Sequence, residues 1–63
     1  MLNIRNLRMR LGMTQEDFAK AVNVSQGAVS QWEIGLTRPG LRAMVKIAHL
    51  MGVTVEELLN ECA

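Results

Sequence analysis

The chain has 63 residues, close to the smallest size at which a domain folds without disulfides or bound metal, so it leaves room for one modest core and little room for a substrate cleft. Its composition, with 49% apolar and 21% charged residues, excludes a disordered segment and is typical of a soluble globular domain. A single cysteine excludes an internal disulfide, and the apolar runs are too short for a transmembrane helix or a signal peptide. We therefore expect one cytoplasmic domain spanning residues 1–63.

The net charge of +1 conceals an uneven distribution of charge along the chain. Residues 1–52 contain all seven Lys and Arg residues and only three acidic residues, for a formal charge of +4. Residues 53–63 contain three acidic residues and no basic residue, for a formal charge of −3. This segregation permits a phosphate-binding face on the first part of the chain.

The first predicted helix covers residues 4–11. Asn3 is suited to the N-cap position, where its side chain can accept a hydrogen bond from a free backbone N–H. The apolar residues Ile4, Leu7 and Leu11 recur at spacings of three and four, which places them on one buried stripe.

Two further helices follow closely. Thr14 can cap the second helix, with Asp17 completing a short form of the capping box. Asn23 predicts the end of that helix, because asparagine tolerates the left-handed conformation common at helix C-termini. Ser25 can cap a third helix that runs to about Glu33.

The remainder of the chain predicts a loop and two more helices. Residues 34–40 contain the breakers that predict the loop, and a fourth helix follows over residues 41–51. Thr54 and Glu57 form a capping box that opens a short fifth helix through Leu59. The predicted fold class is therefore all-α, a compact five-helix domain.

Residues 15–32 predict a helix-turn-helix. Two short helices meet across about three residues there, which forces a steep crossing. A close crossing needs a small side chain where the backbones approach, and Ala19 occupies that position. The apolar residues expected to point into the shared core are Phe18, Val22, Val24, Val29 and Trp32.

The outward surface of the third helix is unusual for a solvated helix. Its residues are Gln26, Gly27, Ser30 and Gln31. Water-exposed helices favour Lys and Glu, whereas glutamine amides and serine hydroxyls are suited to hydrogen bonding with base edges. Gly27 costs a helix interior about 1 kcal/mol relative to alanine, which suggests a compensating close contact. The alternative is a neutral face that contacts only solvent.

Several segments together resemble the Cro/C1-type family of phage and bacterial repressors over nearly the whole chain. They are MTQEDFA at residues 13–19, VSQGAVSQWE at residues 24–33, TRP at residues 37–39, IA at residues 47–48 and GVTVEELL at residues 52–59. The resemblance implies a lambda repressor-like fold of five helices, binding to operator DNA as a dimer, and control of transcription.

The resemblance also implies specific DNA contacts. Its base-facing positions fall on Gln26, Gly27, Ser30 and Gln31. The sequence departs from the family pattern at Asn23, which replaces the commoner glycine of the turn, and at Gly27, which replaces a larger side chain. The first change is compatible with the same backbone geometry, whereas the second leaves open which base is contacted.

Three residues are implied as phosphate contacts. Gln15 begins the second helix, where the backbone N–H and the helix dipole favour an anion without a charged side chain. Arg38 and Arg42 flank the start of the fourth helix. For Arg42, a solvated arginine without a DNA contact is an equal alternative.

The resemblance further implies a structural ion pair and a dimer contact. Arg8 and Glu33 occupy the positions of a largely buried ion pair that Trp32 would shield; the alternative is an exposed pair. Val55 and Leu36 are the expected centre of a small, weak homodimer interface that could form mainly on DNA.

Other residues are not expected to take part in catalysis or in ligand binding. His49 has no neighbours with metal-ligand spacing, and Cys62 has no nearby base, so we predict no enzyme activity, metal, cofactor or small-molecule ligand. Met9, Met13 and Met51 are predicted to fill gaps in the core.

The sequence therefore predicts a sequence-specific transcriptional regulator that contacts operator DNA with its third helix. A phage or prophage Cro-like protein is favoured because no second domain follows. The alternative is the antitoxin of a toxin–antitoxin pair, which would bind DNA and a protein partner. A module that binds only proteins is disfavoured by the Gln/Ser-rich third helix.

Overall fold

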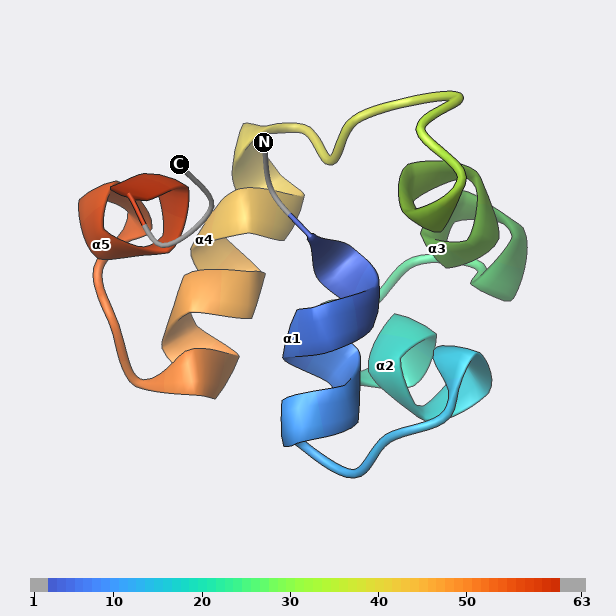
Figure 1. Cartoon of the computed structure of the whole chain (residues 1–63), viewed down its shortest axis with the longest axis horizontal. Helices are drawn as coiled ribbons and strands as arrows, with labels where there is room; N and C mark the ends of the chain where they lie inside the picture. Colours follow the sequence, from blue (N-terminus) through green and yellow to red (C-terminus); the bar gives the residue numbers. More distant parts are fainter. Residues whose placement is uncertain (1–2, 61–63) are drawn as a thin grey trace.

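The computed structural model describes residues 3–60 and contains five helices and no strand within that range (Figure 1). The helices are α1 (Ile4–Arg10), α2 (Gln15–Val22), α3 (Gln26–Glu33), α4 (Leu41–Met51) and α5 (Val55–Asn60). The predicted all-α, five-helix fold is confirmed. Helix α1 ends one residue earlier than expected and α5 extends one residue further, because helix ends are less strongly specified than helix cores.

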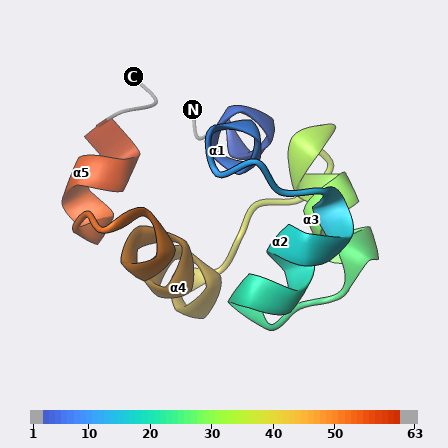
Figure 2. The ribbon, with the colours of Figure 1, turned by 90° about the horizontal axis from the view of Figure 1, so that it is seen from below.

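The helices form two groups, α2 with α3 and α4 with α5, and α1 lies between them. Helices α2 and α3 pack together most extensively, α1 packs against α3, and α4 packs against both α2 and α5. Figures 1 and 2 show α3 and α5 at opposite ends of a molecule that measures 25 × 21 × 20 Å. The α2–α3 pair therefore presents its outer surface well away from the acidic α5.

Side chains near the helix N-termini satisfy backbone N–H groups that have no partner within the helix. Asn3 accepts a hydrogen bond at 3.0 Å from the Asn6 N–H. Thr14 Oγ1 accepts one from the Asp17 N–H at 3.1 Å, and the Asp17 carboxylate accepts one from the Thr14 N–H at 3.4 Å. The predicted N-cap of α1 and capping box of α2 are therefore present, and these local contacts fix where each helix begins.

The end of α2 and the start of α5 are also fixed by local chemistry. Asn23 has φ 59° and ψ 48°, the left-handed conformation that ends α2. Thr54 Oγ1 accepts a hydrogen bond from the Glu57 N–H at 3.0 Å, which opens α5. Both helix boundaries follow directly from the types of residue at these positions.

One hydrophobic core joins all five helices. Phe18, Val29, Ile47 and Leu58 come from α2, α3, α4 and α5 and are fully buried. The two core residues from α1 are Ile4 and Leu7. Since every helix supplies buried apolar surface, the orientation of α3 is set by the whole domain rather than by the turn alone.

The prediction for the methionines is only partly correct. Met13 and Met51 are half-buried against the core, as expected, but Met9 is largely exposed on α1. The methionine that fills the core is Met44 on α4. Within residues 3–60, no helix combines the length and apolar character needed to cross a membrane.

Candidate nucleic-acid interface

The turn between α2 and α3 is built by three consecutive residues, Asn23, Val24 and Ser25. The left-handed Asn23 reverses the chain, and the Val24 N–H donates to the Ala19 carbonyl at 2.9 Å. Ser25 Oγ then accepts a hydrogen bond from the Ala28 N–H at 3.1 Å and caps α3. Ala19 is buried where the chain folds back, which agrees with the need for a small side chain there.

Helix α3 has one anchored side and one outward side. Val29 is fully buried and fixes the helix to the core. Gln26, Gly27 and Gln31 are exposed, while Ser30 is partly covered. The outward surface of α3 therefore presents amide groups, a hydroxyl and a bare backbone position, and no formal charge.

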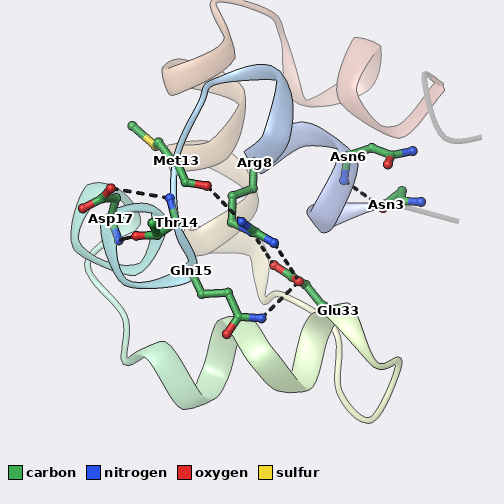
Figure 3. Close-up of polar contacts among 8 residues, drawn as sticks. All are labelled: Asn3, Asn6, Arg8, Met13, Thr14, Gln15, Asp17 and Glu33. Carbon is green, nitrogen blue, oxygen red and sulfur yellow. Dashed lines mark hydrogen bonds and ion pairs between the residues drawn. The ribbon is translucent and has the colours of Figure 1, made fainter.

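Arg8 and Glu33 form a nearly buried ion pair that joins α1 to the end of α3 (Figure 3). Arg8 Nε donates to Glu33 Oε2 at 2.8 Å, and the Arg8 and Glu33 side chains are 15% and 7% exposed. A second guanidinium nitrogen of Arg8 donates to Glu33 Oε1 at 3.3 Å, and the third donates to the Met13 carbonyl at 2.9 Å. Arg8 thus also holds the turn that precedes α2.

Gln15 belongs to the same polar cluster, which the sequence did not predict. Its Nε2 donates to Glu33 Oε1 at 3.1 Å, so the first residue of α2 is tied to the last residue of α3. Figure 3 shows the Gln15 amide and the Arg8 guanidinium directed at the same carboxylate. The side chain of Gln15 is therefore held in place before any ligand binds.

The pKa of Glu33 reflects this cluster. Burial by itself would raise the pKa, but hydrogen bonds from Arg8 and Gln15 and the positive charges of Arg8 and Arg5 outweigh it and lower the pKa below the ordinary glutamate value. Glu33 is therefore ionised at neutral pH. A charged carboxylate is the form that orients the amide nitrogen of Gln15 toward it.

The two other proposed phosphate contacts, Arg38 and Arg42, lie between the end of α3 and the first turn of α4 along the chain. Arg38 is exposed in the loop that connects α3 to α4, and Arg42 is exposed in the first turn of α4. Their charges lie on the part of the chain that carries the positive excess, whereas the exposed Glu56 and Glu57 lie on α5, at the opposite end of the molecule from α3 (Figure 2).

The residues expected at a dimer interface lie near a surface pocket in the sequence, but neither lines it. Leu36 is exposed in the loop after α3, and Val55 is half-buried against the core at the start of α5. The pocket has a volume of about 540 Å³. Its lining residues are Ile4, Trp32, Gly35, Thr37, Arg38, Pro39, Met44 and Leu59. Leu59, which the sequence analysis did not single out, is more exposed than Val55 and lies one turn further along α5.

Residues 4–58 match the family described as helix-turn-helix. The chain is a helix-turn-helix protein of the Cro/C1 type. The match covers nearly all of the described residues, including the α2–α3 pair and the capped start of α5. The predicted resemblance is thereby confirmed.

Its relatives include several transcription regulators. An HTH-type transcriptional regulator from Archaeoglobus fulgidus is 40% identical over 55 residues, covering 87% of this chain and 79% of that protein. The HTH-type transcriptional activator BcrR of Enterococcus faecalis is 35% identical over 57 residues, covering 90% of this chain and 28% of BcrR. The cryptic phage CTXphi transcriptional repressor RstR of Vibrio cholerae is 31% identical over 58 residues, covering 92% of this chain and 52% of RstR.

A solved structure has the same fold. The clp gene regulator ClgR of Corynebacterium glutamicum superposes with a TM-score of 0.79 at 29% identity, over 94% of this chain and 63% of that one. The family to which this helix-turn-helix protein belongs is therefore one of DNA-binding transcription regulators.

Two residues that the sequence analysis considered remain, His49 and Cys62. His49 is exposed on α4, and no group of three or more potential metal ligands occurs in that part of the chain. Cys62 lies outside the described residues.

Proposed function

We propose that this helix-turn-helix protein binds operator DNA with α3 in the major groove and thereby controls transcription. The observation that carries the proposal is the two-sided character of α3, where Val29 is fully buried, Gly27 and Gln31 lie on the opposite side and are exposed, and Gln26 is exposed at the N-terminal end. An α-helix is about 10–12 Å across with its side chains, so α3 fits the major groove, which is about 12 Å wide.

Gln26 and Gln31 supply the base contacts in this proposal, together with Gly27 and Ser30. A glutamine amide donates and accepts, so it can pair with adenine N6 and N7 and discriminate by about 1–3 kcal/mol. Gln26 is the first residue of α3, the end that recognition helices present to the bases.

Gln15, Arg38 and Arg42 supply phosphate contacts that position α3. The amide nitrogen of Gln15 has two hydrogens, one of which is directed at Glu33, so the other is available to a phosphate oxygen. Its location at the N-terminus of α2 adds the favourable end of the helix dipole. Such contacts supply affinity without sequence information.

Two protomers bind the two half-sites of an operator in this proposal. Leu59 and Val55 are one turn apart on α5, and the pocket beside Leu59 extends to the loop that carries Leu36. A small apolar contact around these residues would be weak in free solution and would form mainly on DNA. The similarity to RstR supports a phage-type repressor, whereas the similarity to BcrR leaves activation as the other sign of regulation.

The experiment compares two variants that should change DNA binding in different ways, one through sequence preference and the other through overall affinity. Gln26→Ala should relax the preference at one base pair of each half-site and leave the salt dependence of binding nearly unchanged. Arg38→Ala should weaken binding to all sequences alike and reduce the slope of log K against log salt by about 1. Binding is measured on a selected operator and on random duplexes between low and high salt. If Gln26→Ala retained full discrimination, the assignment of α3 as the recognition helix would be wrong.

A further inference from the structure

Gly27 lies on the outward side of α3, and nothing within the protein requires a glycine at that position. It occupies the second position of the helix, and it is not among the glycines with positive φ, so its backbone is that of an ordinary helical residue. A Cβ added to it would meet only Ser25 Oγ, at 3.9 Å, which is an ordinary contact. Alanine would therefore fit both the backbone and the space within the domain.

A glycine at such a position lowers the stability of the fold. It has more conformational freedom than alanine in the unfolded chain, and it leaves the helix backbone uncovered. Neither the turn nor the core of this domain offsets that cost, because nothing in the described chain lies closer than an ordinary contact to the missing side chain. A ligand that approaches α3 closely from outside would account for a bare position here.

The neighbours of Gly27 indicate the kind of group that approaches. Gly27 shares its side of the helix with Ser30 and Gln31, three and four residues further on, and Gln26 precedes it. These neighbours offer hydrogen-bonding groups, whereas Gly27 offers only Cα and open space. Base pairs present hydrogen-bonding groups in the major groove, with one apolar projection, the 5-methyl group of thymine.

We propose that Gly27 is a specificity-determining residue whose missing side chain accommodates the methyl group of a thymine in the operator. This inference rests on the proposed function and deepens it, because it assigns a base to one position of α3. The methyl group packs against the Gly27 Cα between the polar side chains, and a Cβ at this position would push α3 away from the base pair.

The experiment uses Gly27→Ala on the operator selected by the wild-type protein. The variant should melt about 3–8 °C higher, because alanine restricts the unfolded chain. It should nevertheless bind the operator about 5- to 150-fold more weakly, the range for one lost base-pair match. Replacing one particular thymine of each half-site by deoxyuridine, which removes only the methyl group, should restore most of that affinity for Gly27→Ala. The same replacement should weaken wild-type binding by about 4-fold, because the packing of one methyl group is lost.

Asn6→Ala is the matched control, because Asn6 is an exposed helical residue on α1, away from α3 (Figure 3). It should also raise the melting temperature and should bind the operator like the wild type. The inference is overturned if Gly27→Ala binds the operator with wild-type affinity, if no deoxyuridine substitution restores its binding, or if its melting temperature falls. If the wild-type protein enriches no sequence from random duplexes, the proposed function fails as well; if it does and Gly27→Ala is unaffected, only the inference about Gly27 fails.

Discussion

The guanidinium group of Arg8 donates hydrogen bonds to both a carboxylate and a backbone carbonyl. Two nitrogens donate to Glu33 and one to Met13, so a single side chain connects α1, the turn before α2 and the end of α3. Gln15 adds a further hydrogen bond to the same carboxylate. A nearly buried charge is tolerated here because each partner has several hydrogen-bonding groups directed at it.

Removing the carboxylate should destabilise the fold strongly. Glu33→Ala is expected to lower the free energy of unfolding by about 3–5 kcal/mol, because the Arg8 guanidinium would remain with little access to water and without its counter-charge. Urea denaturation followed by circular dichroism measures the change. For a domain of this size the loss is comparable to its total stability, so the variant should be largely unfolded at room temperature.

Glu16→Ala is the control for a charge pair in a different environment. Lys20 Nζ lies 3.6 Å from Glu16 Oε1, but their side chains are 75% and 66% exposed. The expected loss is about 0–1 kcal/mol, since water screens such a pair. A Glu33→Ala protein as stable as Glu16→Ala would show that the Arg8–Glu33 pair contributes no more than an exposed one.

The sequence and its family resemblance together predicted part of this cluster. The pairing of Arg8 with Glu33 followed only from the resemblance, because 25 residues separate the two along the chain. Gln15 was predicted as a phosphate contact, but its hydrogen bond to Glu33 was not, because it depends on how α2 crosses α3. Contacts between helices require the tertiary arrangement, which the spacing of residues does not specify.

The helix boundaries, in contrast, were largely predictable. Each cap at Asn3, Thr14 and Ser25 joins a side chain to a backbone group three residues away, so local sequence contains the needed information.

Met9 was assigned wrongly to the core. It lies two residues after Leu7, a rotation of about 200° around the helix, which turns it away from the buried stripe.

Asn23 provides a test of the α2–α3 turn. Asn23→Ala should lower the free energy of unfolding by about 1–2 kcal/mol, because alanine is strained in the left-handed conformation, whereas Asn23→Gly should be neutral or slightly stabilising. Thermal melts of the two variants measure the difference. Equal melting temperatures for both would mean that the turn does not require the left-handed geometry.

At the scale of the whole molecule, the polar surface of α3 and the acidic α5 occupy opposite ends (Figures 1 and 2). In the proposed complex, this separation would leave α5 free to contact another protomer while α3 contacts DNA. The apolar side chain of Leu59 beside the pocket is the feature best placed for such a contact.

The proposed dimer contact predicts an effect of Leu59 on DNA binding. Leu59→Gln should weaken binding to a two-half-site operator by more than about 5-fold and leave binding to a single half-site unchanged, because only the full site brings two protomers together. Val45→Gln is the control, since Val45 is 50% exposed and Leu59 is 55% exposed, but Val45 does not line the pocket. Sedimentation on the full operator should show two protomers, and one protomer per operator would contradict the dimer.

Trp32 gives this domain an optical property that follows from its sequence and its position. It is the only tryptophan in a chain that has no tyrosine, so one side chain dominates the near-ultraviolet absorbance and the intrinsic fluorescence. The indole is half-buried, lines the pocket and lies beside Glu33 at the end of α3. Its emission maximum and its quenching therefore respond to the local environment of α3 and of the pocket, so the unlabelled protein contains its own fluorescent probe of both.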